Sequence, residues 1–393
     1  MCIIVYNIFL ITNHLIQSIM KIKQFFLLAA LAVSATATLT SCDNIVGEED
    51  NPAPVTPTEP ETPEEELVYT FSLRNLADDA DVTPTGDLTV TNQAGASITY
   101  TVSDGKYTIK EDDLGSATDL WFEATTATGK YIAKAKKADL AGISEEGKLK
   151  MATLGNIIGA DGKFYANKTA AETASPVTTG AAMIVYLGDE GETSTDYKHG
   201  LAIALSDAIS GTCTWGTSSS NTSLDDKNTL SLAIADMAGI ANTATLKDLG
   251  PDYAAAQVAF TYFMTSPSLD LTGYGFSGWF LPSAGQWYKF LNGMCNLEWT
   301  DFGWATGTGS ANFNAANKAF GDAGYDSFGS DTFYWSSSEY DDNNAVNVNF
   351  NSSNGVNVNN DDKDNNNRVR SFLAFPLRTI SNNGVFSFFI ISV

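Results

Sequence analysis

One tract near the C-terminal end constrains the fold of this chain more than any other stretch: residues 341–367, where asparagine alternates with valine. In its first half, AVNVNF, the apolar residues Val346, Val348 and Phe350 fall on one face of an extended strand, and asparagines fall on the other. The segment 355–358 (GVNV) repeats the pattern after a run of turn formers. The tract therefore predicts a β-hairpin whose apolar face packs on a core and whose asparagine face is open to a polar partner.

The flanks of this tract decide between order and disorder. Asparagine-rich segments are often disordered, but this one is entered through TFYWSSSEY (332–340) and left through RVRSFLAFPL (368–377). Disordered segments seldom carry such apolar flanks, so we expect an ordered hairpin with an exposed polar face. The candidate ligand-binding residues are one aromatic side chain, expected to face outward, and the short amide and carboxylate side chains of the tract: Tyr340, Asp341, Asp342, Asn343, Asn344, Asn347, Asn349, Asn351, Asn357, Asn359, Asn360, Asp362, Asp364, Asn365, Asn366 and Asn367.

The charge balance of the chain limits its partners. It carries 46 acidic residues against 22 basic ones, a formal net charge of -24. Such a surface repels phosphate backbones, so no nucleic acid is expected as a partner. With two histidines and no common catalytic motif in a fitting context, we expect neither an enzyme nor a cofactor nor a metal centre. Calcium binding by the acidic flanks of the tract, such as Asp341 and Asp361, stays open as an alternative.

The N-terminal segment has the features of a targeting signal. Residues 1–42 contain a basic stretch from Met20, an apolar run and then small residues, which is the pattern of a secretory signal. The segment ends in LTSC, which resembles the lipobox of bacterial lipoproteins and implies that Cys42 becomes the lipidated first residue of the mature chain. Residues 1–19 precede a better start at Met20, so the true start codon stays open.

The segment that follows Cys42 is predicted to be a tether. Residues 43–67 are acidic and rich in proline, threonine and glutamate, a composition typical of an extended linker. The acidic residues directly after Cys42 resemble the surface-export signal of Bacteroidetes lipoproteins. We therefore expect a protein that is lipid-anchored in the outer membrane and displayed at the cell surface.

Two folded parts are expected after the tether, and together they predict the α+β class. Residues 68–147 contain alternating segments such as VYTFSL, DLWFEATT and GKYIAKAK, with regular turn signals between them, which predicts an Ig-like antiparallel β-sandwich. Residues 148–378 mix strands, loops and short helices, which predicts a loop-rich α+β domain. The tail 379–393 is largely apolar and stays unassigned.

Three helices are expected in the second part. One runs through LDDKNTLSLAIADMAG, with Asp225 or Asp226 as its N-cap and Gly239 as its stop. Another follows Asp252, and a third begins after Ser283 as its N-cap.

Three motifs of the second part resemble known proteins. Residues 279–287 (WFLPSAGQW) resemble the W-x-L-P-(S/T)-x-x-x-W block of the C-type-lectin fold of formylglycine-generating-enzyme type, and 334–339 (YWSSSE) resemble its strand entry. The asparagine tract with its exit 368–375 (RVRSFLAF) is similar to the variable proteins of diversity-generating retroelements. The resemblance covers about residues 150–378 and implies a C-type-lectin-like domain with a variable tract at 335–375.

The resemblance also implies how the tract would arise. In that family an error-prone reverse transcriptase mutates adenines in the 3′ end of the gene, so asparagine codons drift while scaffold codons persist. The ligand face would then be diversified, and the sequence does not identify its ligand. The reactive cysteine pair of the fold's enzymes is not matched by Cys213 and Cys295, which could either pair or remain buried thiols.

The leading hypothesis is a surface-anchored lipoprotein that binds a protein or glycan through a diversified asparagine-rich face. The alternative is a fixed-specificity adhesin or a pilus-like structural subunit, in which the asparagine face packs against a neighbouring subunit. A thiol oxidase of the same fold is disfavoured because it would need a reactive cysteine.

Overall fold

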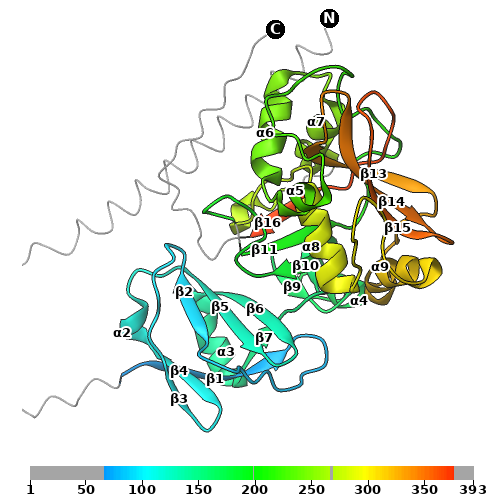
Figure 1. The fold of residues 1–393 in the computed structure, drawn as a ribbon. Coiled ribbons are helices and arrows are strands. Elements are labelled where there is room, and N and C mark those ends of the chain that lie inside the picture. The colour runs from blue at the N-terminus through cyan, green and yellow to red at the C-terminus, as the bar shows by residue number, and fades with distance from the viewer. Residues whose placement is uncertain (1–65, 198, 266–268, 376–393) are drawn as a thin grey trace, which may run out of the picture. The chain divides into compact units, whose positions relative to one another are not determined.

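The computed structural model describes residues 66–197, 199–265 and 269–375, which belong to one compact unit (Figure 1). The predicted signal region with Cys42 and nearly all of the predicted linker lie outside the described residues, and so does the predicted tail 379–393. Within the described ranges, no helix combines the length and the apolar character that crossing a membrane requires.

The described chain as far as Met151 forms two small sheets. Their strands are β1 (Val68–Asn75), β2 (Thr89–Asn92), β3 (Thr101–Ser103), β4 (Lys106–Lys110), β5 (Asp119–Thr126), β6 (Gly129–Lys136) and β7 (Lys148–Met151). One sheet has the order β3-β4-β1-β7 and the other the order β2-β5-β6. The short helical elements of this part are α2 (Glu111–Leu114), η1 (Lys137–Asp139) and α3 (Leu140–Glu146).

Alternation along the sequence explains the strands of this first part. Tyr69, Phe71 and Leu73 alternate along β1 and are all buried in its core. Strands β5 and β6 have the bounds that the sequence predicts. The prediction of an antiparallel sandwich is wrong in one respect, because β7 pairs in parallel with β1, with Leu149 opposite Leu73.

The parallel pair also bears on where the first part ends. Strand β7 follows helix α3, and a parallel pair needs such a crossover connection rather than a tight turn. Sheet pairing therefore continues to Met151, past the limit of 147 that the sequence suggests. The predicted domain limits themselves stay a prediction.

The second part contains a five-stranded sheet, drawn in green except for the red β16 in Figure 1, and a four-stranded sheet drawn mostly in orange. Their strands are β8 (Ile157–Gly159), β9 (Phe164–Tyr165), β10 (Gly180–Leu187), β11 (Gly200–Ala204), β12 (Gly303–Trp304), β13 (Thr332–Glu339), β14 (Asn344–Asn351), β15 (Gly355–Asp362) and β16 (Phe372–Phe375). The orders are β16-β11-β10-β8-β9 and β12-β15-β14-β13. With the helices below, the described residues form an α+β structure, as the sequence predicts.

Helices connect and cover these two sheets. They are α4 (Lys168–Glu172), α5 (Leu230–Ala235), α6 (Gly239–Leu249), α7 (Ala254–Phe260), α8 (Ala284–Cys295) and α9 (Gly309–Ala323), with the 3₁₀ turns η2 (Tyr262–Thr265) and η4 (Thr272–Tyr274). The predicted start of α8 is confirmed: Ser283 is its N-cap, and its backbone N–H donates to Gln286 Oε1 at 2.9 Å. Helix α9 is not among the predicted helices.

The prediction for the segment before α7 is wrong in its details. Thr229, rather than Asp225 or Asp226, caps α5, and its hydroxyl accepts from the Leu232 N–H. Gly239 begins α6 instead of ending a helix. Its missing side chain serves packing, because a Cβ there would overlap the Gln286 side chain.

Helix α7 also begins differently from the prediction. Its N-cap is Tyr253, which makes no side-chain capping bond, and the predicted cap Asp252 lies one residue earlier. A single position of error is typical of helix ends read from sequence.

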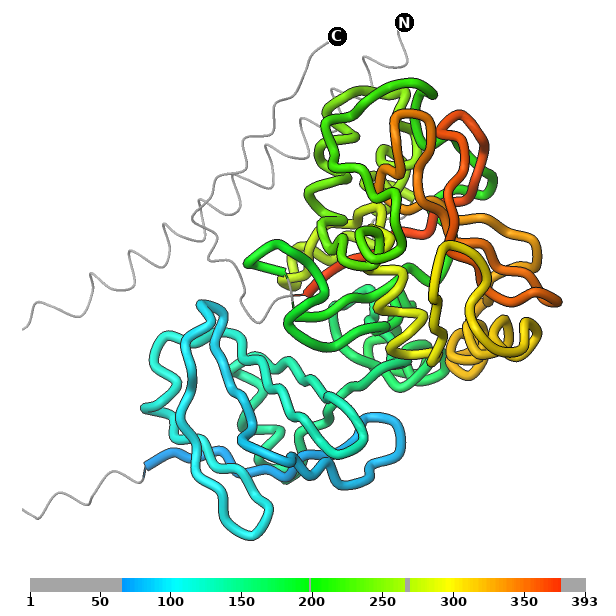
Figure 2. The backbone as a smooth tube through the Cα atoms, in the orientation of Figure 1, coloured from blue at the N-terminus to red at the C-terminus, as the bar shows by residue number. Residues whose placement is uncertain are grey.

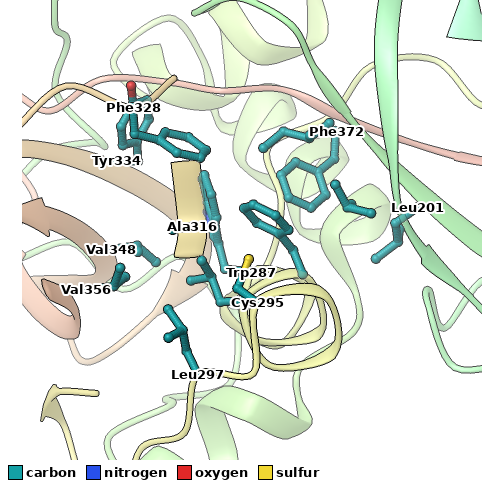
Figure 3. Packing of buried hydrophobic residues seen from close by; sticks show 14 of the residues in the cluster. Leu201, Trp287, Cys295, Leu297, Ala316, Phe328, Tyr334, Val348, Val356 and Phe372 are labelled. Atoms are coloured by element: carbon teal, nitrogen blue, oxygen red, sulfur yellow. The ribbon is translucent and has the colours of Figure 1, made fainter. Parts of the chain in front are cut away.

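The core of the second part is built around Trp287 of α8 (Figure 3). Its ring lies 5.2 Å from the ring of Phe372 and 6.2 Å from that of Phe350, measured between centroids. Phe350 in turn stacks on Phe328 at 4.0 Å. The predicted apolar face of the hairpin is confirmed, since all its members are buried in this cluster: Val346, Val348, Phe350, Val356 and Val358.

Candidate functional site

The register of the asparagine hairpin sets the candidate site. Strand β14 pairs antiparallel with β15, which places Asn347 opposite Asn359 and Asn349 opposite Asn357. Residues directly opposite each other in an antiparallel pair share one face of the sheet. The four asparagines therefore lie together on the face turned away from the buried valines, as the sequence predicts.

The two outer strands extend one of these pairs into a row. Phe333 of β13 lies opposite Asn349, and Trp304 of β12 lies opposite Asn357. The row crosses all four strands in the order Phe333, Asn349, Asn357, Trp304. Both terminal aromatic side chains are 42% exposed. We call these four residues the cross-strand row.

A hollow of about 330 Å³ lies over this face, and we call it the asparagine hollow. Nearly all of its lining side chains carry an amide group. The lining residues are Phe333, Asn347, Asn349, Asn357, Asn359, Asn360, Asp361, Asn365, Asn366 and Asn367. Phe333 and Asp361 are not among the candidate residues that the sequence predicts.

The floor of the hollow is more buried than the sequence predicts. Asn347 is 1% exposed and Asn349 is 7% exposed, so the expectation of a fully exposed asparagine face is wrong for these two residues. The Oδ1 atoms of Asn347, Asn349 and Asn357 are buried and have no hydrogen-bond partner in the described protein. A buried polar atom without a partner costs about 1–3 kcal/mol, so these oxygens are unusual.

A short loop after β15 explains this burial, because it forms the rim of the hollow. Asp361 accepts hydrogen bonds from Asn365 Nδ2 at 2.7 Å and from Asn367 Nδ2 at 3.0 Å. The backbone of Asn367 also pairs with that of Cys213, with N–O distances of 2.9 and 3.0 Å. The chain path in Figure 2 shows this orange-red loop returning beside the green segment. The side-chain amides of Asn365 and Asn367 on the rim are therefore already hydrogen-bonded, while the side-chain oxygens of Asn347 and Asn349 on the floor are not.

Several predicted site residues form turns beside the hollow instead. Burial opposes ionisation of Asp341, but its hydrogen bonds from the Asn343 and Asn344 backbone outweigh that effect and lower the pKa of its carboxyl. Asn351 accepts from the Ser353 N–H and so closes the hairpin turn. The predicted residues that do not line the hollow are Tyr340, Asp341, Asp342, Asn343, Asn344, Asn351, Asp362 and Asp364.

Tyr340 is the clearest correction among them. The sequence predicts an outward-facing aromatic, but Tyr340 packs against the core cluster, and its ring lies 5.4 Å from that of Phe302. The exposed aromatic residues on the asparagine face are Phe333 and Trp304, whereas Trp335, which lies opposite Asn347 on the same face, is fully buried. Alternation along TFYWSSSE places Phe333 and the buried Tyr334 on opposite faces of the strand. The sequence therefore contained a signal that Phe333 lies on the asparagine face. Trp304 has no such signal in its own segment.

The two described cysteines are free, which answers the question that the sequence left open. Burial raises the pKa of the Cys213 thiol to about 11 and that of the Cys295 thiol to about 12. A thiol acts as a nucleophile only as its thiolate, so neither is activated near neutral pH. No group of side chains suited to holding a metal ion occurs in the described part of the chain.

Comparisons with known proteins add little to this geometry. No protein-family model matches the chain, and no curated protein matches it. Among solved structures, a fimbrial protein from Bacteroides ovatus is similar, with 14% identity and a TM-score of 0.39. That match covers 79% of this chain and 71% of the other. A likeness of this degree carries no argument about fold or function.

Proposed function

We propose that this chain is a surface-anchored binding protein that holds its ligand in the asparagine hollow. The anchor is the lipid that the sequence predicts on Cys42, with residues 43–67 as the tether. The proposal includes no catalytic step, no cofactor and no nucleic-acid partner.

One observation carries the proposal: the three unpartnered amide oxygens of Asn347, Asn349 and Asn357. The hairpin is held by its valine face, so its fold does not need these amides. Each buried oxygen lowers stability by about 1–3 kcal/mol unless a donor reaches it. Residues that reduce stability without a structural role are typical of binding sites. A ligand that donates hydrogen bonds into the hollow accounts for all three.

The finer parts of the proposal concern the fold type and the origin of the tract. We include a C-type-lectin-like fold for residues 148–378 and an Ig-like module for residues 68–147. We also include diversification of the tract, which is supported by the alternation of valine and asparagine along its strands. On β15 the buried residues Val356 and Val358 alternate with Asn357, which is half-buried, and Asn359, which is exposed, so changes at these asparagines leave the core contacts in place. Sequencing the locus in several isolates tests this: a nearby repeat of codons 335–375, altered only at adenines, is expected.

A pilus-like structural subunit is the second candidate. The two exposed aromatic residues of the cross-strand row, Phe333 and Trp304, favour it, because aromatic side chains anchor many protein–protein interfaces. Spontaneous polymerisation of the tag-free full chain, abolished by Phe333→Ser, would support this second candidate over the first.

The main proposal is tested by replacing the floor amides with a side chain of similar shape. The full chain is first screened against glycan and protein arrays, and the ligand found is then measured with Asn347→Leu and Asn349→Leu. We expect each variant to lose most of its affinity while its stability is unchanged or higher, since the unpartnered oxygen is gone. Stability is followed by urea unfolding.

A matched control is Asn354→Leu, the same change at an exposed turn position outside the hollow. It should leave both affinity and stability close to those of the parent. Full affinity in both Asn347→Leu and Asn349→Leu would refute the hollow as the binding site. A marked loss of stability in the two variants would show that the amides serve the fold instead.

A further inference from the structure

We infer that the ligand of the asparagine hollow is a neutral carbohydrate of linked sugar rings that stacks on Phe333 and Trp304. This inference rests on the proposed function and names the ligand class and two further binding residues. Neither aromatic residue belongs to the candidate set drawn from the sequence.

The cross-strand row gives the site its length. Phe333 and Trp304 lie on the two outer strands of a four-stranded sheet, with Asn349 and Asn357 between them. Neighbouring strands are about 4.8 Å apart, so the row spans about 14 Å. One six-membered ring is shorter than that distance. A ligand that contacts both aromatic residues must therefore be longer than one ring, and a chain of linked sugar rings meets this length.

The chemistry of the row matches a carbohydrate. A sugar hydroxyl both donates and accepts hydrogen bonds, and an asparagine side chain offers one acceptor oxygen and two donor hydrogens. The unpartnered oxygens of Asn347, Asn349 and Asn357 need donors at close spacing, which neighbouring hydroxyls on a ring supply. The C–H faces of sugar rings are apolar and gain from packing on exposed aromatic rings. Phe333 lines the hollow, whereas Trp304 lies beyond it, one strand past Asn357, and both are exposed enough for this contact.

The charges around the hollow favour a neutral ligand. No lysine, arginine or histidine is among the lining residues, so a phosphate, sulfate or carboxylate group would find no cation there. The one charged lining residue, Asp361, already accepts from Asn365 and Asn367. An anionic ligand would also meet the strongly negative net charge of the chain.

The shape of the site favours a small extended ligand over a protein surface. The site is concave, and its volume of about 330 Å³ lies at the lower end of the range for small-molecule sites. A flat protein epitope would not fill a concave site. Binding of a protein at this face is accordingly an outcome that the test can reveal and that counts against the inference.

The probes are neutral oligosaccharides of glucose, mannose, galactose or N-acetylglucosamine, three to six units long, with their sulfated forms alongside. Affinity for the full chain is measured by isothermal titration calorimetry after a screen by saturation-transfer NMR. At least one neutral series should bind, with affinity rising from the monosaccharide to the trisaccharide. Its sulfated form should bind at least tenfold more weakly.

The two aromatic residues are tested by truncation. Phe333→Ala and Trp304→Ala should each weaken binding at least tenfold, whereas Phe333→Tyr should retain it because the aromatic face remains. Phe260→Ala is the matched control, since Phe260 is 41% exposed and belongs to α7 rather than to the four-stranded sheet. It should bind like the parent.

The outcomes separate this inference from the proposed function. If only a protein ligand binds and Asn347→Leu abolishes that binding, the proposed function stands and the carbohydrate inference is wrong. Oligosaccharide binding that Phe333→Ala and Trp304→Ala leave unchanged also refutes the inference. If Asn347→Leu and Asn349→Leu leave every observed ligand bound as before, both the function and the inference fail.

Discussion

The ammonium group of Lys363 contacts the carboxylate of Glu339 in an ion pair that solvent does not reach, since both side chains are 0% exposed. The same ammonium donates to the backbone oxygens of Ser220 and Asp342, each at 2.8 Å. The Thr222 hydroxyl donates to the other carboxylate oxygen at 2.5 Å. A lysine inside the asparagine tract thus joins the segments of Ser220 and Asp342 to the buried Glu339, and it is not among the residues that line the hollow.

We predict that Lys363→Met destabilises the protein by about 3–5 kcal/mol, because it leaves the Glu339 carboxylate buried without its counter-charge. Urea unfolding of the full chain measures the change. The double variant Lys363→Met with Glu339→Leu should recover much of the loss, since an apolar pair of similar volume removes the unpaired charge. A single variant as stable as the parent would contradict the role of the pair.

We predict opposite sensitivities for two tryptophans. Trp287→Ala should lower the free energy of unfolding by about 3–5 kcal/mol, because the ring is fully buried among Phe290, Phe350 and Phe372. Trp304→Ala removes a ring that is 42% exposed and should cost within about 1 kcal/mol. Thermal and urea unfolding of the two variants side by side check this. Equal losses would mean that Trp304 is a core residue and not part of an open face.

We predict that two glycines of helix α9 respond oppositely to alanine. A Cβ on Gly309 would overlap the backbone of Ser353 and Asn354 at the hairpin turn, so Gly309→Ala should cost about 1–3 kcal/mol. Gly321 has nothing within 4 Å of such a Cβ, and Gly321→Ala should gain about 0.5–1 kcal/mol through helix propensity. Urea unfolding decides the signs. A Gly309→Ala variant at least as stable as the parent would show that α9 does not press on the turn.

The local patterns of the sequence predicted the elements whose periodicity is strong. Val346, Val348 and Phe350 recur every second residue, and the structure buries all three. Ser283 as an N-cap predicted the start of α8, and the structure adds Gln286, whose side chain completes a capping box. In both cases the signal lies within a few residues, so no knowledge of distant partners was needed. Helix α9 was missed because three asparagines and two glycines, which are weak helix formers, interrupt its five alanines.

The candidate site was predicted less well, since it depends on contacts between distant segments. Asn347 and Asn349 are buried because other strands and the loop after β15 enclose them, and alternation alone reports only which face they occupy. Trp304 joins the face through the register of β12 with β15, which no local pattern encodes. Lys363 is one polar residue among many in the tract, and only its buried ion pair with Glu339 distinguishes it from the others.

The thiols of Cys213 and Cys295 predict a loss of stability at high pH. Burial raises the pKa of these thiols from 9.0 to about 11 and about 12. The folded protein therefore holds both protons to a higher pH than the unfolded chain does. Their contribution is fully present below pH 9 and is lost as the pH rises towards 11 and 12, because the unfolded chain ionises first.

We expect the free energy of unfolding to fall between pH 8 and pH 10.5 by about 2 kcal/mol for each thiol beyond what other groups cause. Tyrosines titrate in the same range, so the comparison is with the double variant Cys213→Ala with Cys295→Ala. Its free energy of unfolding should fall by about 4 kcal/mol less than that of the parent, about 2 kcal/mol for each thiol removed. Iodoacetamide labelling gives an independent check: at pH 8 both thiols should react slowly in the folded chain and quickly in urea. Parallel declines in the two proteins, together with rapid labelling of the folded chain, would show that these thiols ionise normally.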